Sequence, residues 1–221
     1  MARFVGILGD TGSGKSRSII NLDPKTTVVI NVLGKDLPFK GASKNYIDSQ
    51  NLFQINNYGL LTALLNKIDK SGIKVVVIDD MRFLMTKEFF DKATETGYSK
   101  FTVIAKNFQS LLELIQTLRK DLIVFGMFHD DDEVSDNVIV KKKIKLVGKL
   151  VEDQYNPVEV MGICLYCKPT IGKDVVTYQF YTNRTKIDGV EIPAKSPEGM
   201  FDSLTIPNDL QFVVDKINEY Y

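Results

Sequence analysis

The sequence predicts an α/β fold in which a mostly parallel sheet is flanked by helices and ends in a C-terminal antiparallel hairpin. Near-continuous apolar, β-branched runs alternate along the chain with segments of helical periodicity, as strands buried on both faces of a parallel sheet require. Right-handed crossovers then place helices over the sheet. Two apolar runs around a turn, at residues 158–167 and 175–182, predict the closing hairpin.

The remaining elements follow from periodicity and from turn residues. The expected strands are rich in Val and Ile and comprise residues 3–8, 26–31, 53–55, 73–80 and 121–128. The expected helices comprise residues 16–22, 82–96, 100–120 and 208–221, the last with Pro207 near its first turn. A further helix is expected after Asn56 or Asn57, either of which could cap it, and Ser71-Gly72 ends it. Residues 33–51 and 184–204 show no period and are expected to be loops. Because no repeat or linker interrupts the chain, we expect one domain over residues 1–221.

Composition limits the function classes. The chain has 221 residues, 44% apolar and 25% charged, with zero formal net charge, so any nucleic-acid binding would need a local basic patch. No apolar run approaches the ~20 residues that span a bilayer, so we expect no membrane contact and a cytoplasmic protein. Cys164 and Cys167 lack a second ligand pair for zinc, and on a strand they point to opposite faces, so we expect buried, reduced thiols.

A glycine-rich turn follows the first strand. It matches the phosphate-binding loop G-x-x-x-x-G-K-[ST] at every fixed position, and the predicted helix follows it directly. Free N–H groups at a helix N-terminus face an anion, Lys15 reaches the outer phosphates, and the Ser16 hydroxyl is a ligand for Mg²⁺. A turn that binds nothing is the disfavoured alternative. The sequence therefore predicts that ATP and Mg²⁺ bind at Gly9, Asp10, Thr11, Gly12, Ser13, Gly14, Lys15, Ser16 and Arg17.

Polar residues end two of the later strands, at the sheet edge where α/β proteins bind ligands. Asp79 is the candidate acid for holding Mg²⁺, directly or through water. Asp80 either orients water or caps the next helix, and the cap is slightly favoured. His129 ends the strand at 121–128 and is a candidate sensor of the γ-phosphate, the alternative being a surface histidine. This order of elements is typical of P-loop NTPases of the RecA-like class.

Hydrolysis needs further groups. RecA-like enzymes usually carry a glutamate after the second strand, where this chain has residues 31–36, so Asp36 is the substitute and turnover is expected to be slow. Arg184 and Lys186 follow the last hairpin strand and resemble the paired basic finger that such proteins insert into a neighbouring subunit's site. Solvated loop charges are the equally weighted alternative. The candidate catalytic residues are Lys15, Asp79, Asp80, His129, Arg184 and Lys186.

The chain resembles phage-encoded RecA-like ATPases of the AAA-superfamily type, the phage nucleotide-binding proteins, some of which act beside single-strand annealing proteins. The resemblance rests on residues 9–16 and 75–80, on 30–39 after the second strand, and on 183–184 through 195–201. It implies an ATP-binding recombination or replication accessory factor acting on single-stranded DNA in the cytoplasm of the infected host. It also implies a homo-oligomer with ATP at the subunit interface.

Three functions remain to be distinguished, and the first is an ATPase that acts on single-stranded DNA. Support for DNA contact comes from Tyr155 and from a basic stretch, Lys141, Lys142, Lys143, Lys145 and Lys149. Residues 140–146 also alternate like a strand with a solvated lysine face, which is the alternative interpretation. A nucleotide-gated loader or binding module with little hydrolysis is favoured by the missing glutamate. A small-molecule kinase is less favoured, because the arginines are scattered rather than gathered in a lid.

Overall fold

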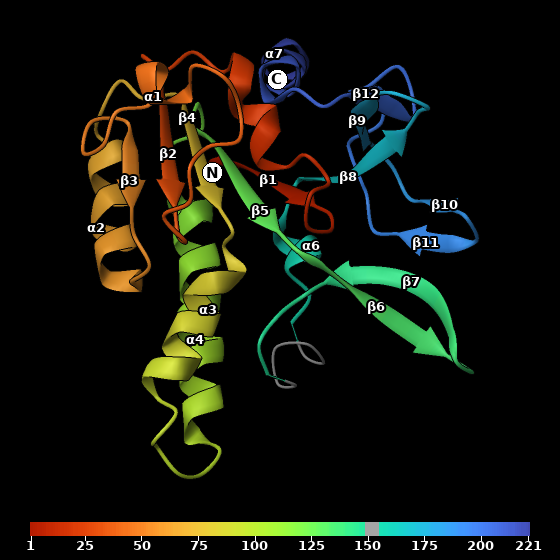
Figure 1. The fold of residues 1–221 in the computed structure, drawn as a ribbon. Helices are drawn as coiled ribbons and strands as arrows, with labels where there is room; N and C mark the ends of the chain where they lie inside the picture. Colours follow the sequence, from red (N-terminus) through yellow and green to blue (C-terminus); the bar gives the residue numbers. More distant parts are fainter. Residues whose placement is uncertain (149–154) are drawn as a thin grey trace.

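The computed structural model describes residues 1–148 and 155–221 and has a mostly parallel sheet at its centre (Figure 1). Eight strands lie in the order β12-β9-β8-β1-β5-β4-β2-β3. All pairs from β8 to β3 are parallel, whereas β9 pairs antiparallel with β8 and with β12. The bounds are β1 (Arg3–Leu8), β2 (Thr27–Asn31), β3 (Leu52–Gln54), β4 (Val75–Asp79), β5 (Ile123–Phe128), β8 (Ile163–Ile171), β9 (Val176–Tyr181) and β12 (Thr205–Pro207). The predicted fold class is confirmed.

The strand order decides where the polar residues meet. β5 lies between β1, which leads into the phosphate loop, and β4, which ends at Asp79. In register, Val77 of β4 pairs with Val29 of β2 and with Phe125 of β5. Because these strands are parallel, their carboxyl ends share one edge, which carries the loop, Asp79 and His129.

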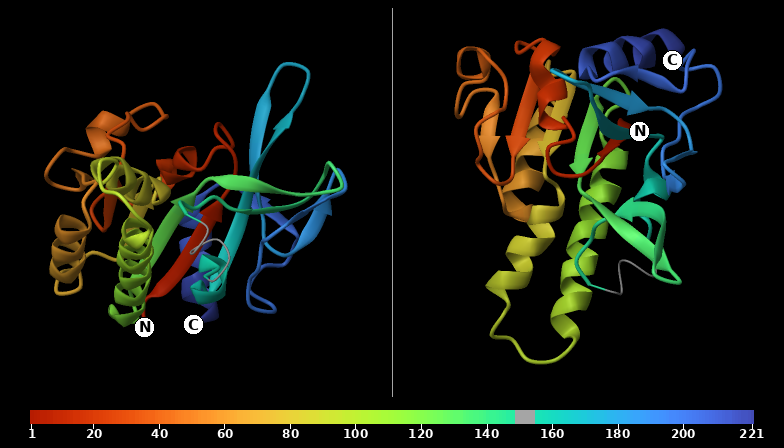
Figure 2. Two further views of the ribbon diagram at one scale, coloured as in Figure 1. Left: turned by 90° about the horizontal axis from the view of Figure 1, so that it is seen from below. Right: turned by 45° about the vertical axis from the view of Figure 1, so that its right-hand side comes forward.

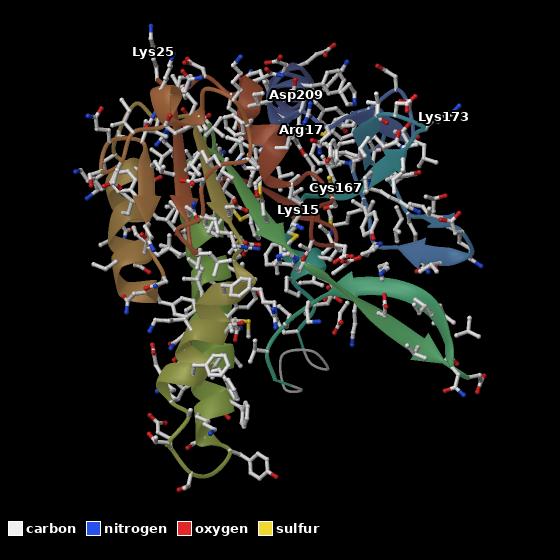
Figure 3. All side chains as sticks on the ribbon, viewed as in Figure 1. Lys15, Arg17, Lys25, Cys167, Lys173 and Asp209 are labelled. Atoms are coloured by element: carbon white, nitrogen blue, oxygen red, sulfur yellow. The ribbon has the colours of Figure 1, made fainter. Side chains whose placement is uncertain are left out.

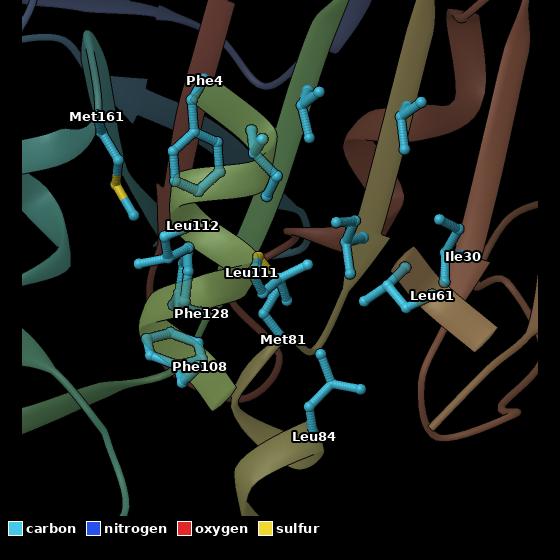
Figure 4. Packing of buried hydrophobic residues seen from close by; sticks show 14 of the residues in the cluster. Phe4, Ile30, Leu61, Met81, Leu84, Phe108, Leu111, Leu112, Phe128 and Met161 are labelled. Carbon is cyan, nitrogen blue, oxygen red and sulfur yellow. The ribbon is translucent and has the colours of Figure 1, made fainter. Parts of the chain in front are cut away.

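Helices cover both faces of the sheet. The helices are η1 (Ser16–Asn21), α1 (Ala42–Asn45), α2 (Tyr58–Ile68), α3 (Arg82–Asp91), α4 (Ser99–Thr117), α6 (Pro157–Val160) and α7 (Leu210–Tyr220). On one face Leu61 of α2 and Phe108 of α4 lie in the same cluster as Ile30 of β2 (Figure 4). On the other face Ile19 of η1 and Val213 of α7 lie in the cluster that contains Val77. Alternate residues of each strand thus supply two separate cores.

A second sheet was not expected from the sequence. Its order is β10-β11-β7-β6, with β6 (Asp130–Ser135), β7 (Val138–Ile144), β10 (Thr185–Ile187) and β11 (Val190–Ile192). The β6–β7 hairpin begins directly after His129 and extends away from the main sheet (Figure 2). The expectation of a loop at residues 184–204 was therefore wrong, since they contain the β10–β11 hairpin, and residues 130–133, for which no strand was expected, lie in β6. Acids of β6 face lysines of β7 across the ladder, so β6 shows no apolar pattern. The strand-like alternation seen at residues 140–146 does correspond to a strand, since β7 ends at Ile144.

Smaller differences concern element ends and loop content. The helix after the phosphate loop is a six-residue 3-10 helix, and the one expected at 82–96 ends at Asp91. The segment 33–51 contains α1 and buries Leu37 and Tyr46, so it is not simply a surface loop. Pro207 belongs to β12, and Asp209 caps α7. Within the described residues, no helix has the length and apolar character needed to cross a bilayer.

Candidate nucleotide-binding site

The phosphate loop joins β1 to η1 in a conformation that needs glycine. Gly12 and Gly14 have φ of +76° and +99°, values that side chains disfavour. A Cβ at Gly9 would lie 2.5 Å from the Cys167 carbonyl oxygen and 2.7 Å from Ser13 Oγ. The loop borders a cavity of about 290 Å³. Lys15 and Arg17 line this cavity, and Figure 3 labels them together with Cys167 in the same part of the fold.

Lys15 lies buried in this loop. Its ammonium donates hydrogen bonds to the carbonyl oxygens of Gly9 (2.7 Å) and Asp10 (2.8 Å), using two of its three N–H donors. Burial lowers the pKa of Lys15, and the nearby charge of Asp80 acts in the opposite direction. The lysine is thus a cation held against the loop, facing the cavity that a phosphate would enter.

The buried thiol of Cys167 contacts the phosphate loop, and the sequence did not indicate this contact. The Cys167 thiol donates to the Ser13 carbonyl oxygen at 2.9 Å and accepts from the Asn208 amide at 3.1 Å. Burial raises the pKa of Cys167 to about 12, so the group remains a neutral thiol. Cys164 and Cys167 are both free and buried, and they lie in the cores on opposite faces of the sheet. The expectation of buried, reduced thiols is confirmed for both.

Asp79 ends β4 beside the loop. Burial raises the pKa of Asp79 to about 6, repulsion from Asp80 adds to this, and a hydrogen bond from Ser16 opposes it. Asp79 Oδ1 is buried and has no hydrogen-bond partner in the described part of the chain, and neither has Ser13 Oγ. The Ser16 hydroxyl and the Asp79 carboxylate, with its unpaired oxygen, suit Mg²⁺, because this ion prefers oxygen ligands. The residues present therefore fit the ion.

Asp80 points toward the cavity, not toward the following helix. It adopts a left-handed φ of +61°, and its Oδ1 accepts from His129 Nε2 at 2.8 Å. Its Oδ2 lies 3.5 Å from Lys35 Nζ. Burial would raise the pKa of Asp80, but His129 and Lys35 together hold it below the usual range. The favoured cap interpretation was wrong, because Met81 is the N-cap residue of α3 and no side chain caps it.

Two residues at this cavity were missed in the sequence. Tyr178 of β9 covers Gly14, where a Cβ would lie 2.5 Å from its ring, and Arg17 lies 5.3 Å from the ring centroid. Lys35 lines the cavity from the segment after β2. Tyr178 carries no motif signal, because only the pairing of β8 with β9 and β1 brings it to the loop.

Three other candidates lie elsewhere. Arg184 is exposed and donates to Glu191 Oε2 at 2.6 Å, and Lys186 is exposed on β10. Neither lines the loop cavity. Asp36 lines a separate cavity of about 580 Å³, so the structure does not bring it to the phosphate loop.

The basic stretch is matched by acids of the same sheet. Lys142 pairs with Asp132 at 2.5 Å and lies 3.5 Å from the buried Asp130. Lys145 pairs with Asp131 at 3.1 Å. Lys141 lies 3.8 Å from Glu191. Tyr155 is half-buried, and Lys149 lies outside the described residues. The local positive charge is therefore smaller than the sequence suggested.

Comparisons with known proteins add little to this geometry. No protein-family model matches the chain, and no curated protein matches it. Among solved structures, a KaiC-like protein from the hyperthermophilic archaeon Pyrococcus horikoshii is similar, with a TM-score of 0.48 and 10% identity. The match covers 81% of this chain and 77% of that one. The functional conclusions below rest on the site itself.

Proposed function

We propose that this chain is a Mg²⁺-dependent ATP-binding protein with ATPase activity. One observation carries the proposal: Asp79 at the end of β4 keeps a buried oxygen without a hydrogen-bond partner among the described residues, and Ser16 of the phosphate loop lowers its pKa. An unpaired buried carboxylate oxygen costs folding energy, and such groups occur where a ligand completes them. Lys15 lies in the same loop and supplies the cation for the phosphates.

The chain's own residues divide the work of binding. Backbone N–H groups of the loop and Lys15 hold the phosphates, while Ser16 and Asp79 hold the metal. Bound Mg²⁺ neutralises charge on the outer phosphates. His129 and Asp80 are hydrogen-bonded to each other at the cavity, where they respond to the terminal phosphate. This pairing supports the role of His129 as a sensor.

Slow hydrolysis is the second candidate property, and one observation favours it. Asn31 ends β2 beside Asp79, in the place where RecA-like enzymes usually carry glutamate. The Asn31 side-chain amide is hydrogen-bonded to the backbone of Gly34 and Lys35 in the turn that follows β2. Since Asp36 lies at another cavity, we expect a nucleotide-gated binding module or loader with little turnover. A small-molecule kinase remains the less favoured reading.

We further propose the biological setting from the family resemblance. It is a phage recombination or replication factor that acts on single-stranded DNA in the host cytoplasm, with recombination or replication proteins as partners. In a homo-oligomer, Arg184 and Lys186 would approach a neighbour's ATP, for which Arg184 must leave Glu191. Support for this setting is the motif pattern; the lysines of β7 add little to it, because Lys142 is already paired with Asp132.

Isothermal titration with ATP, with and without Mg²⁺, tests the site. We expect Mg²⁺-dependent ATP binding by the wild type and a loss of about 100-fold or more in Lys15→Met, since charge-assisted phosphate contacts are strong. Lys25→Met, at an exposed lysine, is the matched control. Single-turnover hydrolysis with protein in excess then separates an ATPase from a gated module. Absence of ATP binding by the wild type would refute the proposal.

A further inference from the structure

The segment after β2 is fixed by Asn31. The Asn31 side chain is buried, its Oδ1 accepts from the Gly34 N–H at 2.8 Å, and its Nδ2 donates to the Lys35 carbonyl oxygen. Gly34 has φ of +71°, and a side chain there would overlap Gln54. The backbone at Lys35 is therefore held in place although the residue is at the surface.

This turn delivers the Lys35 side chain to the phosphate-loop cavity. Lys35 lines that cavity together with Lys15, Asp80 and His129. Its ammonium lies 3.5 Å from Asp80 Oδ2 and 5.9 Å from the Phe83 ring centroid. The side chain is 67% exposed, so it can move toward a ligand without unfolding anything. Two lysines of one chain thus face one cavity.

We propose that Lys35 contacts the terminal phosphate of a bound nucleoside triphosphate, so that the chain supplies this cation to its own site. The inference rests on the proposed function. Asn31 is then a positioning residue, whose amide holds the turn that carries Lys35. Arg184, by contrast, lies outside the cavity and is paired with Glu191.

The chemical consequence is discrimination between nucleotides. The γ-phosphate carries charge that a diphosphate lacks at that position, and a lysine contact with a phosphate is a charge-assisted hydrogen bond. Lys35 therefore strengthens binding of the triphosphate and leaves binding of the diphosphate nearly unchanged. Lys15, which serves the loop itself, contributes to both.

Calorimetric titration of a non-hydrolysable ATP analogue and of ADP, each with Mg²⁺, tests the assignment. In Lys35→Met we expect analogue affinity to fall about tenfold, equivalent to about 1.4 kcal/mol, with ADP affinity within about twofold of wild type. Lys35→Arg should restore most of the difference. Lys40→Met, at an exposed lysine of the same segment, should change neither affinity.

Asn31→Ala tests the positioning role. It should lower the ratio of analogue to ADP affinity in the wild-type background and have no further effect on that ratio in the Lys35→Met background. Equal weakening of both nucleotides in Lys35→Met, or an unchanged ratio, overturns the assignment of Lys35 while leaving the proposed function intact. A wild type that binds neither nucleotide overturns both.

Discussion

Two regions of this chain bring lysines and carboxylates together, and they differ in what they leave unpaired. At the phosphate-loop edge, Asp79 Oδ1 and Ser13 Oγ are buried without partners in the described part of the chain. On the second sheet, acids and lysines pair across the strands, as Asp132 does with Lys142. Even the buried Asp130 there accepts a hydrogen bond, from Tyr166 at 2.7 Å.

The difference distinguishes a binding site from a structural ion-pair ladder. Charges that satisfy one another across exposed strands stabilise pairing and need no ligand. Buried oxygens without partners cost free energy, and those that lie beside a phosphate loop are suited to a ligand that completes them. Neutralising Asp79 is thus expected to raise the free energy of unfolding, whereas removing a partner from the ladder is expected to lower it.

Asp79→Asn gives the largest effect on this comparison. Because the folded-state pKa of Asp79 is raised to about 6, its neutral form is the one that folding favours. Its contribution is therefore present at low pH and is lost as pH rises from about 4 to about 6. At pH 7 without Mg²⁺, we expect the variant to be more stable than wild type by on the order of 3 kcal/mol. Urea unfolding at pH 7 and at pH 5 measures the gain, which should shrink at pH 5.

The same substitution should abolish any Mg²⁺-dependent strengthening of ATP binding, because an amide is a poorer ligand for this ion than a carboxylate. Asp36→Asn, at an exposed acid outside the cavity, is the control and should change neither property. A variant less stable than wild type at pH 7 would mean that Asp79 is satisfied by the fold, and the contrast between the two regions would disappear.

Tyr166→Phe tests the other side of the comparison, with the opposite sign. The Tyr166 hydroxyl donates to Asp130, whose remaining partner is Lys142 at 3.5 Å. Removing the hydroxyl leaves a buried acceptor poorly satisfied, which costs about 1–3 kcal/mol. Urea unfolding should show this loss, while ATP affinity stays within about twofold. Tyr98→Phe, at a tyrosine that is 89% exposed, should leave stability unchanged; an equally stable Tyr166→Phe would contradict the structural role.

The sequence predicted the sheet edge because its signals are local. The spacing of residues 9–16 fixes a loop conformation, and long apolar runs such as β4 are recognisable without their partners. The end of a buried parallel strand locates Asp79 and His129 at the same edge. These features need no knowledge of which strands pair.

What the sequence did not show depends on pairing across the fold. β6 reads Asp-Asp-Asp-Glu-Val-Ser, which lacks apolar alternation, and only its pairing with the lysines of β7 makes it a strand. The role of Asp80 depends on His129, which lies far away in the sequence and follows a different strand. Lys35 lies in the segment 30–39 that carries the family resemblance, but the position of its side chain depends on the turn held by Asn31. Cys167 reaches the loop through the β1–β8 pair.

Lys145→Gln gives the smallest expected effect and sharpens the comparison at the ladder. Lys145 and Asp131 are each partly exposed, and such pairs contribute up to about 1 kcal/mol, often much less. We expect a change in unfolding free energy below about 0.5 kcal/mol, and single-stranded DNA affinity within about twofold at each salt concentration, because Asp131 already neutralises this lysine. Fluorescence anisotropy with a labelled oligonucleotide, from low to high salt, measures the affinity, and Lys25→Gln is the control for a lost surface charge.

A clear loss of affinity, with a salt slope reduced by about 0.7, would instead show that Lys145 neutralises a DNA phosphate. The second sheet would then be a binding surface as well as a structural ladder, and the contrast with the phosphate-loop edge would no longer hold.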